Sequence, residues 1–127
     1  MKWREGVSLA GIYTFGANSR KLTNEDEVVQ TLKPIADYLK AYPDTKITIS
    51  GNTDLKSPTT STVSSDDQNI TIQQLMDGRA QTLTKVLVEK LKVNPVQVSQ
   101  NPGTQGSDTN GNIKVIQPKK VVKKKSG

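Results

Sequence analysis

A carboxylate follows a short alternating segment at residues 46–54, which read KITISGNTD. Ile47 and Ile49 alternate with polar residues, which is the period of two that a strand with one buried face requires. Gly51 ends this pattern, and Asp54 comes just beyond the expected carboxyl end of the strand. Proteins with α/β architecture commonly place ligand-binding groups there. Asp54 therefore has two interpretations: it contacts a ligand, or it caps a turn by accepting bonds from nearby backbone N–H groups.

Arg79 is the second candidate, because its planar guanidinium group can bond both oxygens of a carboxylate. It lies in the early turns of residues 71–92, whose apolar side chains recur at helical spacing. A helix start adds a field that favours an anion. Right-handed connections between strands and helices would bring Asp54 beside Arg79. The alternative is a surface arginine paired with Asp77 or Asp54, worth about 0 to 1 kcal/mol.

The composition narrows the possible chemistry, because the chain contains neither cysteine nor histidine. Thiol catalysis, disulfides and thiolate metal sites are excluded, and a metalloenzyme or a His-dependent triad is disfavoured. No paired carboxylates or Ser/Lys spacing stand out. We therefore predict that the protein is not an enzyme, with no catalytic residue, no metal and no cofactor.

The net charge of +6 comes mainly from the end of the chain. Five of the 18 basic residues are lysines after residue 118, which leaves 13 basic against 12 acidic side chains in residues 1–118. A nucleic-acid-binding protein should carry its basic residues on a folded face, so we predict no nucleic-acid partner. We expect one domain over residues 1–118 and a basic, disordered tail over residues 119–127.

The alternation of apolar periods along the chain predicts an α+β two-layer sandwich, β-α-β-α-β-β, with both helices on one face of a mixed sheet. We expect strands at residues 7–15, 46–51, 96–100 and 112–117, and helices from Asn24 to about residue 41 and over residues 71–92. The expected core contains Leu32, Ile35, Ile47, Ile49, Leu83 and Leu87. Residues 55–69 are rich in Ser, Thr and Asp, and we expect a long, mobile surface loop there.

Several segments together resemble the OmpA-like peptidoglycan-binding domain. They are Phe15, NSRKL at 18–22, LKPIADYLKAYPDTKITISGNTD at 32–54, LMDGRAQTLTKVL at 75–87 and NPVQV at 94–98. The resemblance covers about residues 8–118. Domains of this family occur at the C-terminus of outer-membrane porins, in peptidoglycan-associated lipoproteins and in flagellar stator proteins. The resemblance also implies the α+β sandwich expected above.

In this family an aspartate after the second strand and an arginine in the next helix hold the diaminopimelate residue of the peptidoglycan stem peptide. The corresponding residues here are Asp54 and Arg79, and Thr53, Asn52 and the turn backbone would assist them. The free end of diaminopimelate is a zwitterion with an ammonium and a carboxylate on one carbon, so one anion and one guanidinium group match it. The resemblance thus implies a non-catalytic cell-wall anchor.

The family also implies a location and partners. We expect a domain excised from an exported parent of a Gram-negative cell envelope, in the periplasm and associated with the outer membrane. The expected partner is peptidoglycan, and envelope proteins are possible further partners. Because no apolar run is long enough to span a membrane, we expect membrane contact only through other regions of the parent.

The chain departs from the family pattern at three places. Ile72 and Met76 stand where the family has asparagine and serine, and the sequence NGNIKV replaces a basic run before the last strand. These changes favour an alternative function, in which the OmpA-like fold has lost its ligand and acts as a scaffold for protein partners in the envelope.

Overall fold

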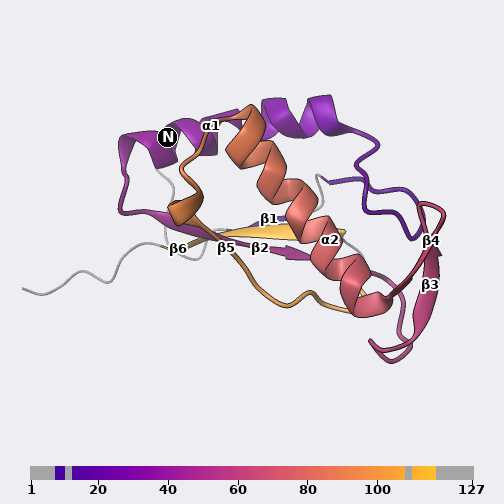
Figure 1. Cartoon of the computed structure of the whole chain (residues 1–127). Coiled ribbons are helices and arrows are strands. Elements are labelled where there is room, and N and C mark those ends of the chain that lie inside the picture. The colour runs from indigo at the N-terminus through magenta and orange to yellow at the C-terminus, as the bar shows by residue number, and fades with distance from the viewer. Residues whose placement is uncertain (1–7, 11–12, 108–109, 117–127) are drawn as a thin grey trace, which may run out of the picture.

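The computed structural model describes residues 8–10, 13–107 and 110–116, and both helices lie on one face of a four-stranded sheet (Figure 1). The strands are β1 Ser8–Ala10, β2 Lys46–Gly51, β3 Thr62–Ser65, β4 Gln68–Thr71, β5 Val98–Gln100 and β6 Gly111–Ile116. The helices are α1 Glu25–Ala41 and α2 Ile72–Lys85, followed by a π-helical turn η1 Val86–Lys90 and a 3-10 turn η2 Pro95–Gln97. The predicted tail and the domain boundary at residue 118 lie outside the described residues.

The main sheet has the order β1-β6-β2-β5. Strand β2 is antiparallel to β6 and parallel to β5, so the sheet is mixed. The predicted fold class, α+β with two helices and a mixed sheet, is therefore confirmed. The register of β2 and β6 runs from Lys46 opposite Ile116 to Gly51 opposite Gly111.

Two predicted strands are shorter than the sequence indicated. Of the expected strand 7–15, β1 covers Ser8–Ala10, and Phe15 forms an isolated bridge with Leu22. Residues 7, 11 and 12 of that expected strand lie outside the described residues. The expected strand 96–100 begins instead with the turn η2, because Pro95 and the side chain of Asn94 favour a turn.

The two helices begin in different ways. Helix α1 starts after Asn24, as predicted, but the Asn24 side chain does not cap it. Its Oδ1 accepts the N–H of Thr14 at 3.1 Å instead, which ties the segment before the helix to the helix start. Helix α2 has a full capping box, because Thr71 Oγ1 accepts the N–H of Gln74 and Gln74 Oε1 accepts the N–H of Thr71.

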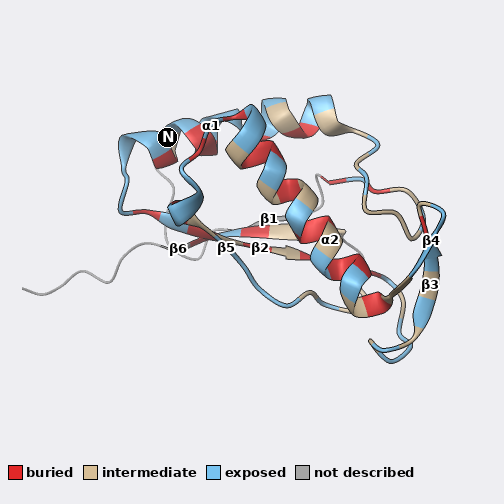
Figure 2. Cartoon of the chain, viewed as in Figure 1, coloured by how far each residue is buried: buried red, intermediate tan, exposed pale blue. Residues whose placement is uncertain are grey.

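The core lies between the helices and the sheet, as the buried stretches in Figure 2 show. All six residues predicted for the core are fully buried: Leu32, Ile35, Ile47, Ile49, Leu83 and Leu87. In β2 the buried residues alternate with exposed or half-buried ones, as the sequence pattern predicts. Within the described part of the chain, no helix combines the length and hydropathy needed to cross a bilayer.

The prediction of a long loop at residues 55–69 is wrong from residue 62 on, whereas residues 55–61 form no helix or strand. Strands β3 and β4 form an antiparallel hairpin, with Val63 opposite Ile70 and Ser65 opposite Gln68. Asp66 and Asp67 form its two-residue turn, with φ of 49° and 67°. Positive φ at both central positions is the geometry that matches the twist of a hairpin, and Asp tolerates it.

Candidate ligand-binding site

The end of β2 lies directly against α2, and Gly51 permits this contact. A Cβ atom on Gly51 would lie 2.1 Å from the carbonyl oxygen of Met76 and 2.7 Å from the Cβ atom of Arg79. No side chain fits in that space. The turn that follows β2 is thereby placed beside Arg79, as the predicted strand and helix connections required.

Arg79 is enclosed by the protein, with 3% of its surface exposed. Its guanidinium group donates four hydrogen bonds: Nε to Ser19 O at 2.7 Å, Nη1 to Asn52 O at 2.7 Å and to Asn110 Oδ1 at 3.2 Å, and Nη2 to Gly16 O at 3.2 Å. The guanidinium carbon also lies 5.1 Å from the centre of the Phe15 ring, a favourable cation–π distance. An arginine has five N–H groups, so one N–H of Nη2 has no bonded partner within the described residues.

The charge of Arg79 is not balanced by a bonded acid. All four acceptors are neutral oxygens, and no ion pair of Arg79 occurs within the part of the chain that the structure describes. Burial lowers the pKa of the Arg79 guanidinium group, while the charges of Asp54 and Asp66 act in the opposite direction. A buried cation without a bonded acid is energetically unfavourable, and the charges of Asp54 and Asp66 offset this cost only in part.

Asp54 is exposed, and it lines the same cavity as Arg79. This cavity has a volume of ≈ 480 Å³. Its other lining residues are Phe15, Gly16, Ala17, Asn18, Leu55, Ser107 and Asn110. Arg79 is buried, so it is not the surface arginine of the alternative interpretation. Asp77, one of the two partners in that interpretation, instead accepts a bond from Gln73 Nε2 at 3.0 Å.

Asn52 and Thr53 are buried and do not line the cavity. Asn52 Oδ1 accepts the N–H of Thr104 at 3.0 Å, and Thr53 Oγ1 accepts the N–H of Leu55 at 3.2 Å. Both side chains therefore fix the turn between β2 and Asp54. Their contribution to the site is through the backbone, since the carbonyl oxygen of Asn52 is one of the acceptors of Arg79.

The segment 16–22 lines one side of the cavity with Gly16, Ala17 and Asn18, and sequence reasoning missed its role. It supplies two carbonyl acceptors of Arg79, from Gly16 and Ser19. Asp66 in the hairpin turn holds this segment, because its carboxylate accepts the Ser19 hydroxyl at 2.7 Å and the Arg20 N–H at 3.1 Å. These two bonds lower the pKa of the Asp66 carboxyl.

The sequence contains no signal for most of these contacts. Backbone carbonyls have no residue signature, and the partners Ser19 and Asp66 are 47 positions apart. Asn110, whose Oδ1 accepts from Arg79 and whose Nδ2 donates to Tyr13 O, is one of several asparagines in a glycine-rich and asparagine-rich segment. Only a structure distinguishes it from its neighbours.

Comparison with known proteins gives matches at the level of structure. No protein-family model and no curated protein sequence matches the chain. The periplasmic domain of Helicobacter pylori MotB matches with a TM-score of 0.65 and 19% identity, over 98% of this chain and 88% of that one.

Two further structures match over most of their length. The OmpA-like domain of FopA1 from Francisella tularensis gives a TM-score of 0.56 at 13% identity, covering 91% of this chain and 83% of that one. The peptidoglycan-associated lipoprotein of Burkholderia pseudomallei gives 0.56 at 19% identity, covering 87% and 89%. The resemblance in the sequence is thus confirmed by architecture: this chain has the OmpA-like fold.

Proposed function

We propose that this chain is a non-catalytic anchor that binds the diaminopimelate residue of peptidoglycan. One observation carries the proposal: a buried guanidinium group without a bonded acid lies at a cavity that also contains an exposed carboxylate. A zwitterionic amino-acid end matches this arrangement. Its ammonium group would bind Asp54, and its carboxylate would approach the remaining N–H of Arg79 and neutralise the buried charge.

The lining of the cavity supports binding rather than catalysis. Asp54 is its single carboxylate among the described residues, and the other side chains are apolar, amide or hydroxyl groups apart from Arg79. Such a set can bind and orient a zwitterion, and it offers no acid–base pair. Asn52 and Thr53 would assist by holding the turn that carries Asp54.

The matched structures support a place in the cell envelope. One is the periplasmic domain of a MotB protein and another is a peptidoglycan-associated lipoprotein. We infer a periplasmic location near the outer membrane for this chain, with peptidoglycan as the partner.

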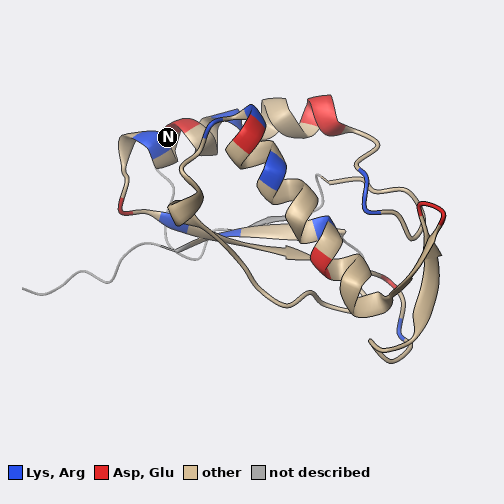
Figure 3. Ribbon diagram, in the orientation of Figure 1, with Lys and Arg blue, Asp and Glu red and all other residues tan. Residues whose placement is uncertain are grey.

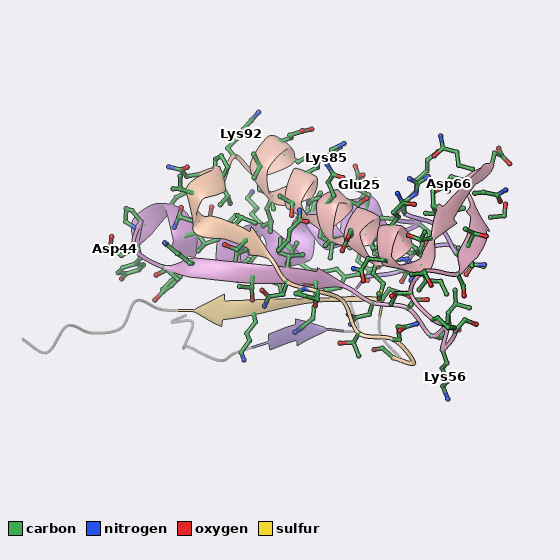
Figure 4. All side chains as sticks on the ribbon, turned by 60° about the horizontal axis from the view of Figure 1, so that its bottom comes forward. Glu25, Asp44, Lys56, Asp66, Lys85 and Lys92 are labelled. Carbon is green, nitrogen blue, oxygen red and sulfur yellow. The ribbon has the colours of Figure 1, made fainter. Side chains whose placement is uncertain are left out.

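Replacing Asp54 by asparagine tests the proposal. Hydrogen bonds to charged groups contribute about 1.5 to 3 kcal/mol, so Asp54→Asn should weaken binding of meso-diaminopimelate by about tenfold or more. Calorimetric or NMR titration measures this, and pull-down on purified sacculi extends it to the polymer. Asp44→Asn is the matched control, because Asp44 is also an exposed turn aspartate and precedes β2 rather than following it (Figure 4).

Arg79 needs a gentler substitution than alanine. Arg79→Ala would remove the hydrogen bonds that Arg79 donates to the carbonyls of Gly16, Ser19 and Asn52, so a loss of binding could reflect a loss of folding. Arg79→Lys keeps the charge and removes the planar fork. It should weaken diaminopimelate binding in a protein that still melts cooperatively. Wild-type protein that does not bind diaminopimelate at millimolar concentration would contradict the proposal.

A scaffold for envelope proteins is the second candidate function. The observation that favours it is the occupation of four of the five Arg79 N–H groups by the protein itself, which is also the pattern of a purely structural arginine. In that case sacculi and diaminopimelate would fail to bind, and Asp54→Asn would change nothing.

A further inference from the structure

A second cavity, of ≈ 390 Å³, lies between the β3–β4 hairpin, the segment 16–22 and α2. Its charged and amide lining residues are Arg20, Lys21, Asp66, Gln68, Gln81 and Lys85. In Figure 3 the basic stretch of the segment before α1 lies between α2 and the acidic turn of the hairpin. The diaminopimelate site proposed above does not use this cavity.

The charges that line this cavity are unequal. Arg20 and Asp66 form an ion pair, with 3.5 Å between Nε and Oδ2, and they largely neutralise each other. Lys21 and Lys85 remain, and both are exposed. Neither forms an ion pair with any residue that the structure describes. Two positive charges thus border the cavity without a local counter-charge.

The hydrogen-bonding groups point to the same class of ligand. The Asp66 oxygens already accept from Ser19 and Arg20, and Gln68 Oε1 accepts from Arg20 Nη2 at 2.9 Å. Within the described part of the chain, the amide N–H groups of Gln68 and Gln81 donate no hydrogen bond. The ammonium groups of Lys21 and Lys85 provide further donors. The Asp66 and Gln68 acceptors are thus occupied, and among the free groups of these described residues the donors outnumber the one free amide oxygen, of Gln81, which favours an oxyanion.

This second cavity and the Arg79 cavity are neighbours. Segment 16–22 borders both, with Gly16 lining one and Arg20 lining the other. Along α2, Gly78 lines one cavity and Arg79 the other. Lys85 follows Arg79 by six residues, which is about 9 Å along a helix axis.

We propose that the second cavity is a subsite for another carboxylate of the same stem peptide, the free glutamyl carboxylate that precedes diaminopimelate. The inference rests on the proposed function and adds a determinant to it. Lys21 and Lys85 attract the carboxylate, and the amides of Gln68 and Gln81 orient it. A stem peptide whose glutamyl carboxylate is amidated lacks this interaction.

Three probes and two double variants test the subsite. The probes are free meso-diaminopimelate, the tripeptide Ala-Glu-diaminopimelate and the same tripeptide with its glutamyl carboxylate amidated. The test variant is Lys21→Gln with Lys85→Gln. Its matched control is Lys33→Gln with Lys40→Gln, two exposed lysines of α1 that are outside both cavities. All substitutions are at exposed positions, and thermal melts check that each variant folds.

We expect wild-type protein to bind the acidic tripeptide about three to ten times more tightly than the amidated one, the range for two solvent-exposed charge contacts. The Lys21/Lys85 variant should lose this preference, and the Lys33/Lys40 variant should keep it. Affinity for free diaminopimelate should be the same in all three proteins. In NMR spectra, the side-chain amides of Gln68 and Gln81 should shift with the acidic tripeptide and stay unchanged with the amidated one.

Two results would overturn the subsite, and they are distinguishable. Equal binding of both tripeptides by wild-type protein, with diaminopimelate still bound, would remove the subsite and leave the anchor function intact. Failure of all three probes to bind would remove the anchor function and the subsite together.

Discussion

At the scale of single residues, Asp66 links the hairpin to the site of Arg79. Its carboxylate holds Ser19 and Arg20, and the carbonyl oxygen of Ser19 accepts from Arg79 Nε. The Thr82 hydroxyl contacts the Arg20 carbonyl oxygen at 2.6 Å and fixes the same segment from the side of α2. One turn residue therefore helps to set the orientation of a guanidinium group to which it is not bonded.

The stability of the protein should depend on the ionisation of Asp66. Its hydrogen bonds to Ser19 and to the Arg20 N–H lower its pKa below the ordinary value of 3.8. A carboxyl with a lowered folded-state pKa contributes stability above its unfolded pKa, and this contribution is lost as the pH falls through the folded-state pKa. Asp66→Asn should therefore destabilise the protein near neutral pH, and its effect should decrease as the pH falls below 3.8 and through the folded-state pKa.

Denaturant unfolding at several pH values, for wild type and Asp66→Asn, measures this difference. Asp67→Asn is the control, because Asp67 is the exposed neighbour in the same turn and also has a positive φ. A difference between wild type and Asp66→Asn that stays constant with pH would show that the charge of Asp66 does not matter.

At this scale the sequence predicted Asp54 and Arg79, and it did not predict Asp66. Asp54 follows a strand with clear alternation, and Arg79 lies in a helix with a clear apolar stripe, so both positions followed from local patterns. The partners of Asp66 are 46 and 47 residues away along the chain. No local pattern contains that information.

At the scale of elements, the contact between the end of β2 and α2 places the site. Gly103 comes equally close on the other side, since a Cβ atom there would lie 1.8 Å from the carbonyl oxygen of Gly51. Segment 101–107 is thus packed against the strand end and bonds to the turn, with Thr53 N donating to Thr104 O at 3.0 Å.

Gly51→Ala should destabilise the protein and weaken the site together. The added methyl group would meet the backbone of α2 at Met76 and Ala80, which cannot rotate away as a side chain can. Overpacking of this kind costs about 1 to 3 kcal/mol or more. Denaturant unfolding measures the loss, and diaminopimelate titration measures the displacement of Arg79.

Ser50→Ala is the control for Gly51→Ala, because it changes the preceding residue, which is half-buried, without adding atoms. Ser50→Ala should lower the free energy of unfolding by less than Gly51→Ala does. Equal stability of Gly51→Ala and wild type would mean that the helix and strand separate at little cost.

The hairpin shows why one element escaped prediction. Its strands contain only Val63 and Ile70 as large apolar residues, and both are half-buried, so the alternation that marks a strand is missing. Polar contacts of its turn with segment 16–22 hold it in place. The helix after it was easier to recognise, because its apolar side chains recur at helical spacing.

At the scale of the whole molecule, one core joins α1, α2 and the main sheet. Ile49 lies in β2, between β5 and β6, and is fully buried. Ile49→Ala should cost about 2 to 5 kcal/mol of unfolding free energy. Val96→Ala is the control, because Val96 is 71% exposed, and it should change stability by less than about 0.5 kcal/mol.

Chemical denaturation of both variants gives the comparison. Similar losses in Ile49→Ala and Val96→Ala would mean that the interior at β2 adapts to the missing atoms. The sequence predicted this part of the fold well, since the two helical stripes and the alternation of β2 all indicate one shared interior. Strand order followed less directly, because the positions of the edge strands depend on pairings between segments far apart in the sequence.

The central position of β2 also determines how the domain would bear mechanical load. A ligand that pulls on Asp54 applies tension to the end of β2, a strand that is hydrogen-bonded on both sides. The six residues of β2 pair with β6 along their whole length, and the bonds of an antiparallel pair are perpendicular to the strands. Tension along β2 therefore shears these bonds together instead of opening them one at a time. An anchor built this way resists extraction of its binding turn through cooperative loading, even where the ligand contacts themselves are few.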